Sequence, residues 1–232
     1  MAVSPLVGDT FCRRQARLAD GAGRIPRRGS PAEGPGASTV PGATDEELLR
    51  SLQAGDHHSL GVLVARWERP LFRFVFRMLP RQDDARDICQ ETFLRILQKA
   101  HRFRPGSRFS TWMYQIALNL CRDQLRRRRR WSLLVSEHGE PPERPQPPGT
   151  AADTQDPARA AELREKSAAV LVALAEIPAE QREVLVLKEF EGLKFREIAE
   201  ILGCPESTVK SRMYYGLSGV RTALVRRGIK EA

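Results

Sequence analysis

The polar residues best suited to chemistry at a nucleic acid lie near the C-terminal end of the chain, between residues 205 and 214. Val209 and Met213 stand four residues apart, so in a helix they form one inward stripe. The outward side chains are then Glu206, Ser207, Lys210, Ser211 and Tyr214. Side chains of these types can reach base edges and phosphates in a major groove. We therefore expect this helix to read a DNA duplex.

Two short helices joined by a tight turn would position those residues. Ile198, Ile201 and Leu202 recur at helical spacing and form an apolar face. Gly203 can adopt the positive φ that ends the first helix, and Pro205 suits the first turn of the next one. The pattern predicts a helix-turn-helix whose second helix is the reader. An ordinary helical hairpin with a glycine turn is the alternative.

A second group of residues combines basic and aromatic side chains around the Pro105-Gly106 turn. Its members are Arg102, Phe103, Arg104, Arg108 and Phe109. Arginines can bind a phosphate backbone and aromatic rings can stack on unpaired bases, as they do in proteins that bind single strands. The alternative is that the aromatic rings pack into a helical core.

The helix expected after this loop ends in the arginine run 126–130. Asn119, Asp123 and Arg126 fall on one of its faces, at i, i+4 and i+7. An amide face beside an aromatic loop and an arginine run favours a nucleic-acid partner. A buried Trp112 followed by a solvated arginine tail is the alternative.

An acidic helix face is expected within residues 81–97. Apolar residues at helical spacing define one side of this helix, and the other side carries Asp84, Asp87, Gln90 and Glu91. No histidine, facing carboxylate helix or glycine-rich phosphate loop accompanies these carboxylates, which argues against a metal or acid–base site. We expect a surface that docks a basic partner, with a plain solvated face as the alternative.

The charge balance also favours a polyanion partner. The 232 residues include 38 Lys and Arg against 29 Asp and Glu, which gives a formal net charge of +9 and a sequence pI of about 9.9. Such a balance points to nucleic acid before a membrane surface. The sequence has no apolar run of the length of about 18 residues that spans a bilayer, and no apolar segment follows its N-terminal arginines.

The cysteines and histidines predict no metal or disulfide chemistry. Cys12, Cys89, Cys121 and Cys204 are far apart and form no CxxC pair, and the four histidines lack metal-ligand spacing. We therefore expect reduced thiols, no metal, no cofactor and a cytoplasmic location.

The chain as a whole predicts an all-α protein of two helical domains. Thr44 and Glu47 form a capping-box pattern where the first domain begins. The expected segments are a disordered extension at 1–43, a first domain at 44–130, a flexible Pro-rich linker at 131–161, a second domain at 162–226 and a tail at 227–232.

Together these motifs resemble the extracytoplasmic-function (ECF) group of bacterial RNA polymerase sigma factors. The segment 84–93 is similar to the family helix that docks on the polymerase clamp, and 109–119 with Arg126-Arg127 is similar to the minus-10 and promoter-melting segment. Four further segments resemble the family domain that reads the minus-35 element: 177–184, 191–192, 197–199 and 208–212. Where the family commonly has an Arg-Ala pair after the reader helix, this chain has Tyr215-Gly216.

The resemblance implies a two-domain, all-helical sigma factor with no enzyme activity of its own. It implies core RNA polymerase, promoter DNA and an anti-sigma factor as partners, and a monomer without membrane contact. Polymerase binding would involve Asp84, Asp87, Gln90, Glu91 and Phe93. Minus-10 recognition and melting would involve Phe103, Arg108, Phe109, Trp112, Asn119, Arg122 and Arg126. Minus-35 recognition would involve Thr208, Lys210, Ser211, Arg212 and Tyr214.

Two other functions stay open at this stage. A helix-turn-helix repressor or activator that binds duplex DNA alone would leave Phe103, Phe109 and Trp112 without a role. A recombinase would need a nucleophilic Ser or Tyr in a clustered active site, or a carboxylate triad, and neither pattern is apparent.

Overall fold

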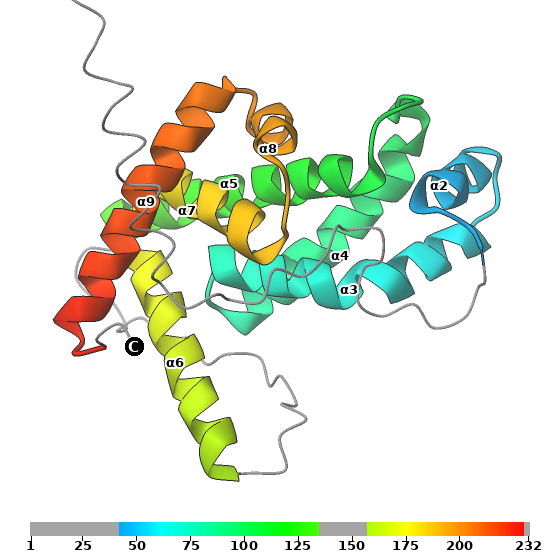
Figure 1. The fold of residues 1–232 in the computed structure, drawn as a ribbon. Helices are drawn as coiled ribbons and strands as arrows, with labels where there is room; N and C mark the ends of the chain where they lie inside the picture. The colour runs from blue at the N-terminus through cyan, green and yellow to red at the C-terminus, as the bar shows by residue number, and fades with distance from the viewer. Residues whose placement is uncertain (1–41, 135–156, 230–232) are drawn as a thin grey trace, which may run out of the picture.

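The computed structural model describes residues 42–134 and 157–229, and within these ranges the chain is helical and contains no strand. Figure 1 shows the helices gathered into two groups that lie against each other. The all-α fold expected from the sequence is confirmed. Most of the predicted N-terminal extension and the central part of the predicted linker lie outside the described residues.

Both domains are built from helices that follow one another along the chain. The first contains α2 (Asp45–Gln53), α3 (His58–Met78), α4 (Gln82–Lys99), the short η2 (Ala100–Arg102) and α5 (Phe109–Leu134). The second contains α6 (Pro157–Glu176), α7 (Ala179–Leu185), the π-helical turn η3 (Val186–Phe190), α8 (Phe195–Leu202) and α9 (Glu206–Arg226). Both ends of the predicted linker (131–161) are therefore helical. The helix α5 continues through the arginine run to Leu134, and α6 already begins at Pro157.

The first helix begins at the capping box that the sequence predicts. The backbone N–H of Glu47 donates to Oγ1 of Thr44 over 3.2 Å, and the N–H of Thr44 donates to Oε2 of Glu47 over 2.7 Å. Two of the N–H groups that a helix start leaves without intrahelical partners are thus satisfied. The buried side of α2 then packs Leu48, Leu49 and Leu52 into the first domain.

Residues 179–190 form two consecutive helical segments. The first segment is α7, and the second is the π-helical turn η3. Gly192 follows η3 with a φ of 69°, a conformation that glycine adopts readily. The wider π turn changes the direction in which Leu187 and Phe190 leave the backbone.

Close approach between α9 and its neighbours depends on two glycines. A Cβ on Gly216 would lie 3.0 Å from Cδ1 of Leu185, and a Cβ on Gly219 would lie 2.8 Å from Cγ2 of Ile177. Separations this short are below ordinary van der Waals contact, so a larger residue at either position would require the Leu185 or Ile177 side chain to shift. Gly216 therefore serves packing inside the second domain, whereas the preceding Tyr215 is exposed.

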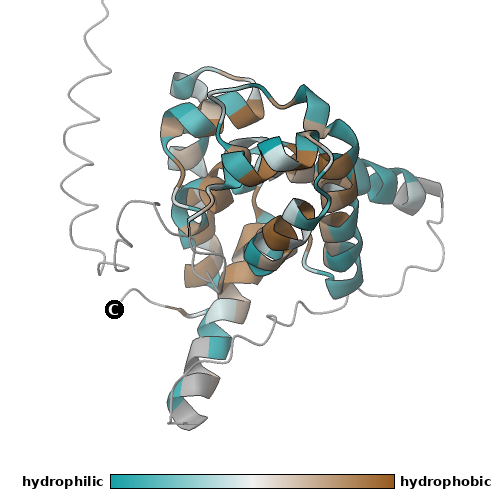
Figure 2. Cartoon of the chain, turned by 90° about the vertical axis from the view of Figure 1, so that its right-hand side faces the viewer, coloured by the Kyte–Doolittle hydropathy of each residue, from teal (hydrophilic) through white to brown (hydrophobic). Residues whose placement is uncertain are grey.

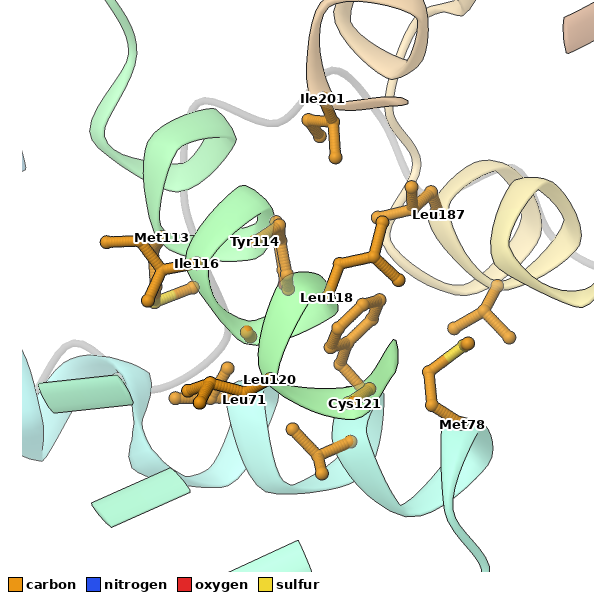
Figure 3. Close-up of a cluster of buried hydrophobic side chains, with 14 of the residues drawn as sticks. Leu71, Met78, Met113, Tyr114, Ile116, Leu118, Leu120, Cys121, Leu187 and Ile201 are labelled. Carbon is orange, nitrogen blue, oxygen red and sulfur yellow. The ribbon is translucent and has the colours of Figure 1, made fainter. Parts of the chain in front are cut away.

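The two domains share one hydrophobic core. Figure 3 shows Leu118 of α5 beside Leu187 of η3, with Ile201 of α8 and Met78 of α3 around the same cluster. Figure 2 shows the same arrangement by hydropathy, with apolar residues turned toward the interior and polar residues outward. The sequence predicted two flexibly tethered domains and did not indicate this direct packing. Apolar spacing shows which face of a helix is buried, but it does not show which other helix covers that face.

Candidate nucleic-acid and polymerase interfaces

The helix-turn-helix of α8 and α9 has the geometry that its sequence predicts. Gly203 ends α8 in the left-handed conformation, with φ 64° and ψ 37°. Pro205 is the N-cap of α9, so residues 203–205 separate the two helices. Val209 and Met213 are buried against the rest of the domain. This confirms both the turn and the inward side of the second helix.

The opposite side of α9 is open to solvent. Ser207, Lys210, Ser211 and Tyr214 are exposed, whereas Thr208 and Arg212 are partly buried. Lys210 approaches Glu206 only to 3.9 Å, and its side chain keeps 60% of its accessible surface. An exposed ion pair one helical turn apart is weak, so Lys210 can exchange Glu206 for another anion.

The two phenylalanines of the Arg/aromatic loop lie in the core. Phe103 is buried, with its ring centroid 5.4 Å from that of Trp112. Phe109 is fully buried 6.0 Å from the ring of Trp67, and its backbone N–H donates to Oε1 of Glu46 over 2.9 Å. The expectation that these rings reach an unpaired base is not met in this conformation. The packing of α2 and α3 against the start of α5 explains why, and sequence spacing does not reveal it.

The polar face of α5 is exposed where the sequence places it. Asn119, Asp123 and Arg126 are exposed, and NH1 of Arg126 lies 3.3 Å from Oδ1 of Asp123. Further along the helix, the arginine run and Asp123 line a shallow surface pocket. Trp112, near the start of the helix, is partly buried. This face offers several guanidinium groups to a phosphate backbone.

Two of the predicted minus-10 arginines are engaged by carboxylates of the second domain. Arg122 donates through Nε to Oε1 of Glu183 over 2.7 Å and through NH2 to Oε2 over 2.6 Å. This hydrogen bonding raises the pKa of the Arg122 guanidinium above its ordinary value. NH1 of Arg108 lies 2.7 Å from Oε1 of Glu197. Arg122 is thus occupied through two hydrogen bonds, whereas the Arg108 side chain keeps 55% of its accessible surface.

The acidic face of α4 divides into an exposed part and a paired part. Asp87 and Gln90 are exposed. Oδ1 of Asp84 accepts a hydrogen bond of 3.0 Å from Gln124, and its other oxygen forms an ion pair with Arg128. Asp84 therefore joins α4 to α5, and only the exposed part can contact a partner directly.

The remaining two residues predicted to bind polymerase also differ in exposure. Glu91 is partly buried and accepts a hydrogen bond of 2.8 Å from Nε of Arg95. Phe93 is buried on the inward side of α4, so its ring supports the helix from within. The same fold that exposes Asp87 thus removes Phe93 from the surface.

A buried polar cluster between the domains was not among the predicted site residues. Oη of Tyr114 donates to Oε2 of Glu191 over 2.5 Å, and NH1 of Arg77 lies 3.6 Å from the other oxygen. Burial raises the pKa of the Glu191 carboxyl and, with the nearby Glu191 charge, raises that of Tyr114 well above its ordinary value. No short-range pattern could pair residues that are 77 positions apart in the sequence.

Within residues 42–134 and 157–229, no group of three or more His, Cys, Asp or Glu side chains is arranged to hold a metal ion. None of the helices in the described part of the chain is both long and apolar enough to cross a membrane.

Two family models match the chain, one in each domain. The model described as Sigma-70 region 2 matches residues 63–131, and the one described as Sigma-70, region 4 matches residues 167–218. The first contains most of α3 together with α4 and most of α5, and the second contains the helix-turn-helix.

Similar whole proteins and solved structures agree with these matches. The chain is 30% identical over 180 residues to the RNA polymerase sigma-H factor of Pseudomonas aeruginosa, covering 78% of this chain and 93% of that protein. It is 29% identical over 180 residues to the ECF RNA polymerase sigma-E factor of Escherichia coli, covering 74% and 89%. The fold resembles that of CnrH in complex with the cytosolic domain of CnrY, with a TM-score of 0.55 and 24% identity over 78% of this chain and 97% of that one. It also resembles the sigma factor RpoE bound to the anti-sigma factor NepR from Bartonella quintana, with a TM-score of 0.55 and 23% identity over 77% and 94%.

Proposed function

Because the chain belongs to the ECF group of the sigma-70 family, we propose that it binds core RNA polymerase, directs it to specific promoters and helps to melt the minus-10 element. Membership of this family makes the protein a transcription initiation factor. The observation that carries the proposal is the exposed polar side of α9 in a helix-turn-helix, combined in one chain with an exposed acidic patch on α4.

Minus-35 recognition is assigned to α9. Lys210, Ser211 and Tyr214 project from the exposed side of a helix whose inward residues fix its rotation. In a major groove each base pair presents a distinct pattern of donors and acceptors, which such side chains can distinguish. Thr208 and Arg212 flank this surface and are placed to contact phosphates, which orient the helix without reading sequence.

Polymerase docking is assigned to the exposed part of the α4 face. Asp87 and Gln90 form its centre, and Glu91 lies at its edge. Asp84 and Phe93 support the surface from behind, because one is tied to α5 and the other is buried. An acidic patch on a basic protein favours a basic partner surface over DNA, which would be repelled there.

Contact with the melted minus-10 strand is assigned to the exposed face of α5. Asn119 can hydrogen-bond a base edge, and Arg126 with the following arginines can bind phosphates. Trp112, near the start of this helix, is partly buried, with Phe103 packed against it. Arg122 can join this surface only after it leaves Glu183, whereas Arg108 is largely exposed beside Glu197.

An anti-sigma factor is proposed as a further partner. Two solved structures of similar fold are complexes, one with the cytosolic domain of CnrY and the other with the anti-sigma factor NepR. The exposed apolar residues Leu217 and Val225, on the same helix as the reader residues, offer contact area to such a partner.

Run-off transcription tests the proposed function. The full chain is mixed with core RNA polymerase and sheared genomic DNA, and the 5′ ends of the transcripts are mapped. We expect discrete start sites that need the added protein and that share sequence motifs near minus-35 and minus-10. A protein that binds duplex DNA tightly without polymerase and directs no start would instead be a stand-alone helix-turn-helix regulator.

A further inference from the structure

Trp131, near the C-terminal end of α5, is an exposed aromatic residue that belongs to none of the surfaces assigned above. Its relative exposure is 69%, and no large apolar side chain in the described part of the chain is more exposed. It directly follows the arginine run 126–130. One exposed aromatic ring carries little meaning by itself, so its surroundings decide what it could bind.

The pairing of α5 with α4 explains why Trp131 is exposed. Gln124 and Arg128 of α5 both bind the carboxylate of Asp84 near the start of α4. Residues seven apart in a helix share one side, so Trp131 lies on the side of Gln124, one turn beyond these contacts. Because α4 begins at Gln82, it has no further turn to cover the indole. The contacts at Asp84 also fix the rotation of α5, and with it the direction in which Trp131 projects.

The side chains around Trp131 are basic. Arg127, one turn earlier on α5, and Arg130, directly before it, are exposed and line the same shallow surface pocket. Burial and the charge of Arg81 both lower the pKa of the Arg128 guanidinium, so Arg81 also lies near this end of α5. Positive surroundings of this kind favour an anionic partner and disfavour the basic surface that the acidic patch on α4 would dock.

An indole beside guanidinium groups has the chemistry that binds a nucleotide. The aromatic ring can stack on the face of a base, and guanidinium groups can form paired hydrogen bonds with phosphate oxygens. Bases inside a duplex are already stacked on both faces, so the base that Trp131 can accept is an unpaired one. The chemistry therefore favours a single strand over a duplex.

The position of Trp131 fits a strand that also reaches Asn119. The two residues are 12 positions apart on α5. At 1.5 Å per residue they are separated by ~18 Å along the helix axis, the length of about five nucleotides at 3.4 Å each. They lie on adjoining sides of the helix, and the exposed Arg127 and Arg130 fall between these sides. One strand can thus contact both residues and bind the arginines on its way.

We propose that Trp131, with Arg127 and Arg130, forms a second single-strand contact on α5, in which the indole stacks on an unpaired base and the guanidinium groups bind the flanking phosphates. This inference rests on the proposed minus-10 role of α5, because it needs the melted strand to reach this helix. Every base has a π-face, so Trp131 adds affinity for the opened strand and does not select its sequence.

The test uses holoenzyme reconstituted from the full chain and core polymerase. The probe is the fluorescein-labelled non-template strand around the minus-10 element of a promoter mapped by run-off transcription. Trp131→Leu keeps an apolar side chain but removes the ring, so the Kd for this strand should rise about tenfold, which corresponds to ~1.4 kcal/mol. Trp131→Phe should restore part of the affinity. The matching duplex should bind equally to all three proteins.

A salt titration separates stacking from charge. Arg127→Gln and Arg130→Gln should each lower the slope of log Kobs against log salt concentration by about 0.7, because each removes one contact to a single-strand phosphate. Trp131→Leu should leave that slope unchanged. A probe strand with 2-aminopurine at successive positions then locates the stack. Its fluorescence should be quenched at one position by wild type and not by Trp131→Leu.

The matched control is Tyr215→Leu, which removes an exposed aromatic ring from the second domain. It should leave the affinity for the strand and the 2-aminopurine signal unchanged. Circular dichroism and the affinity for core polymerase are measured for every variant. Both should match wild type in Trp131→Leu, because the side chain is exposed and lies outside the acidic patch.

The outcomes keep this inference apart from the proposed function. Loss of strand affinity in Asn119→Ala but not in Trp131→Leu would overturn the Trp131 contact and leave the minus-10 role of α5 standing. An equal loss on strand and duplex would overturn stacking on an unpaired base. Weaker core binding by Trp131→Leu with unchanged strand affinity would overturn the inference and move Trp131 to the polymerase interface. A holoenzyme that starts no transcription would overturn the proposed function itself.

Discussion

The side-chain amide of Gln124 on α5 donates a hydrogen bond of 3.0 Å to Oδ1 of Asp84 on α4. Arg128, one turn further along α5, pairs with the other oxygen of the same carboxylate. Asp84 therefore holds the arginine-rich end of α5 against α4. Its neighbour Asp87, one turn along α4, has an exposed side chain. Two acidic residues that look alike in sequence thus have different roles.

The first prediction separates these two roles. The double change Asp87→Ala, Gln90→Ala should weaken binding to core polymerase about tenfold, which corresponds to the ~1–2 kcal/mol typical of a few lost interface contacts. The melting temperature should stay the same, because both side chains are exposed. Asp84→Asn is the matched comparison and should lower the melting temperature. Fluorescence anisotropy against core enzyme measures affinity, and an unchanged value for the double variant would disprove the docking assignment.

The second prediction concerns sequence preference at the minus-35 element. Lys210→Ala should relax discrimination at one or two base pairs by ~1–3 kcal/mol, because one side chain reads only the bases within its reach. Transcription from a promoter library randomised at minus-35 measures this. Thr222→Ala, at an exposed position further along α9, is the control. An equal loss on every sequence would make Lys210 a phosphate contact instead.

The third prediction tests the close approach of α9. Gly219→Ala should destabilise the protein by ~1–3 kcal/mol, because its Cβ would lie 2.8 Å from Cγ2 of Ile177. Gly61→Ala is the matched control, since Gly61 lies near the start of α3 and its Cβ would meet no atom within 4 Å. That change should stabilise the helix by ~0.5–1 kcal/mol. Urea unfolding gives both values, and a Gly219→Ala variant as stable as wild type would show that α9 can move aside.

Local features of the fold could be predicted because neighbouring residues determine them. The Thr44–Glu47 capping box spans one helical turn, and Gly203 ends α8 through its own conformational freedom. The inward position of Val209 follows from helical spacing alone. Each of these depends on residues within one or two turns of one another, so the sequence is sufficient.

Features that depend on long-range packing could not be predicted. Glu183 reads as one of several acidic residues on a helix, and its pairing with Arg122 joins residues 61 positions apart. Phe109 is an aromatic residue close to arginines in the sequence, which suggests base stacking. In the structure its contacts with Trp67 and Glu46 place it in the core. A residue's type shows which interactions it can make, and the packing of distant helices decides which one it does make.

The last prediction concerns melting and distinguishes Asn119 from Phe103. Asn119 is exposed on α5, so Asn119→Ala should slow open-complex formation by holoenzyme on an ordinary promoter. A pre-opened minus-10 bubble should largely rescue it, because unstacking a base costs a few kcal/mol that the bubble template has already met. Phe103 is buried against Trp112, and deleting its ring should cost ~3 kcal/mol of stability. Phe103→Ala should therefore lose activity equally on both templates. Rescue of Phe103→Ala by the bubble would indicate that the Phe103 ring contacts the melted strand. Failure of the bubble to rescue Asn119→Ala would contradict a role for Asn119 in melting.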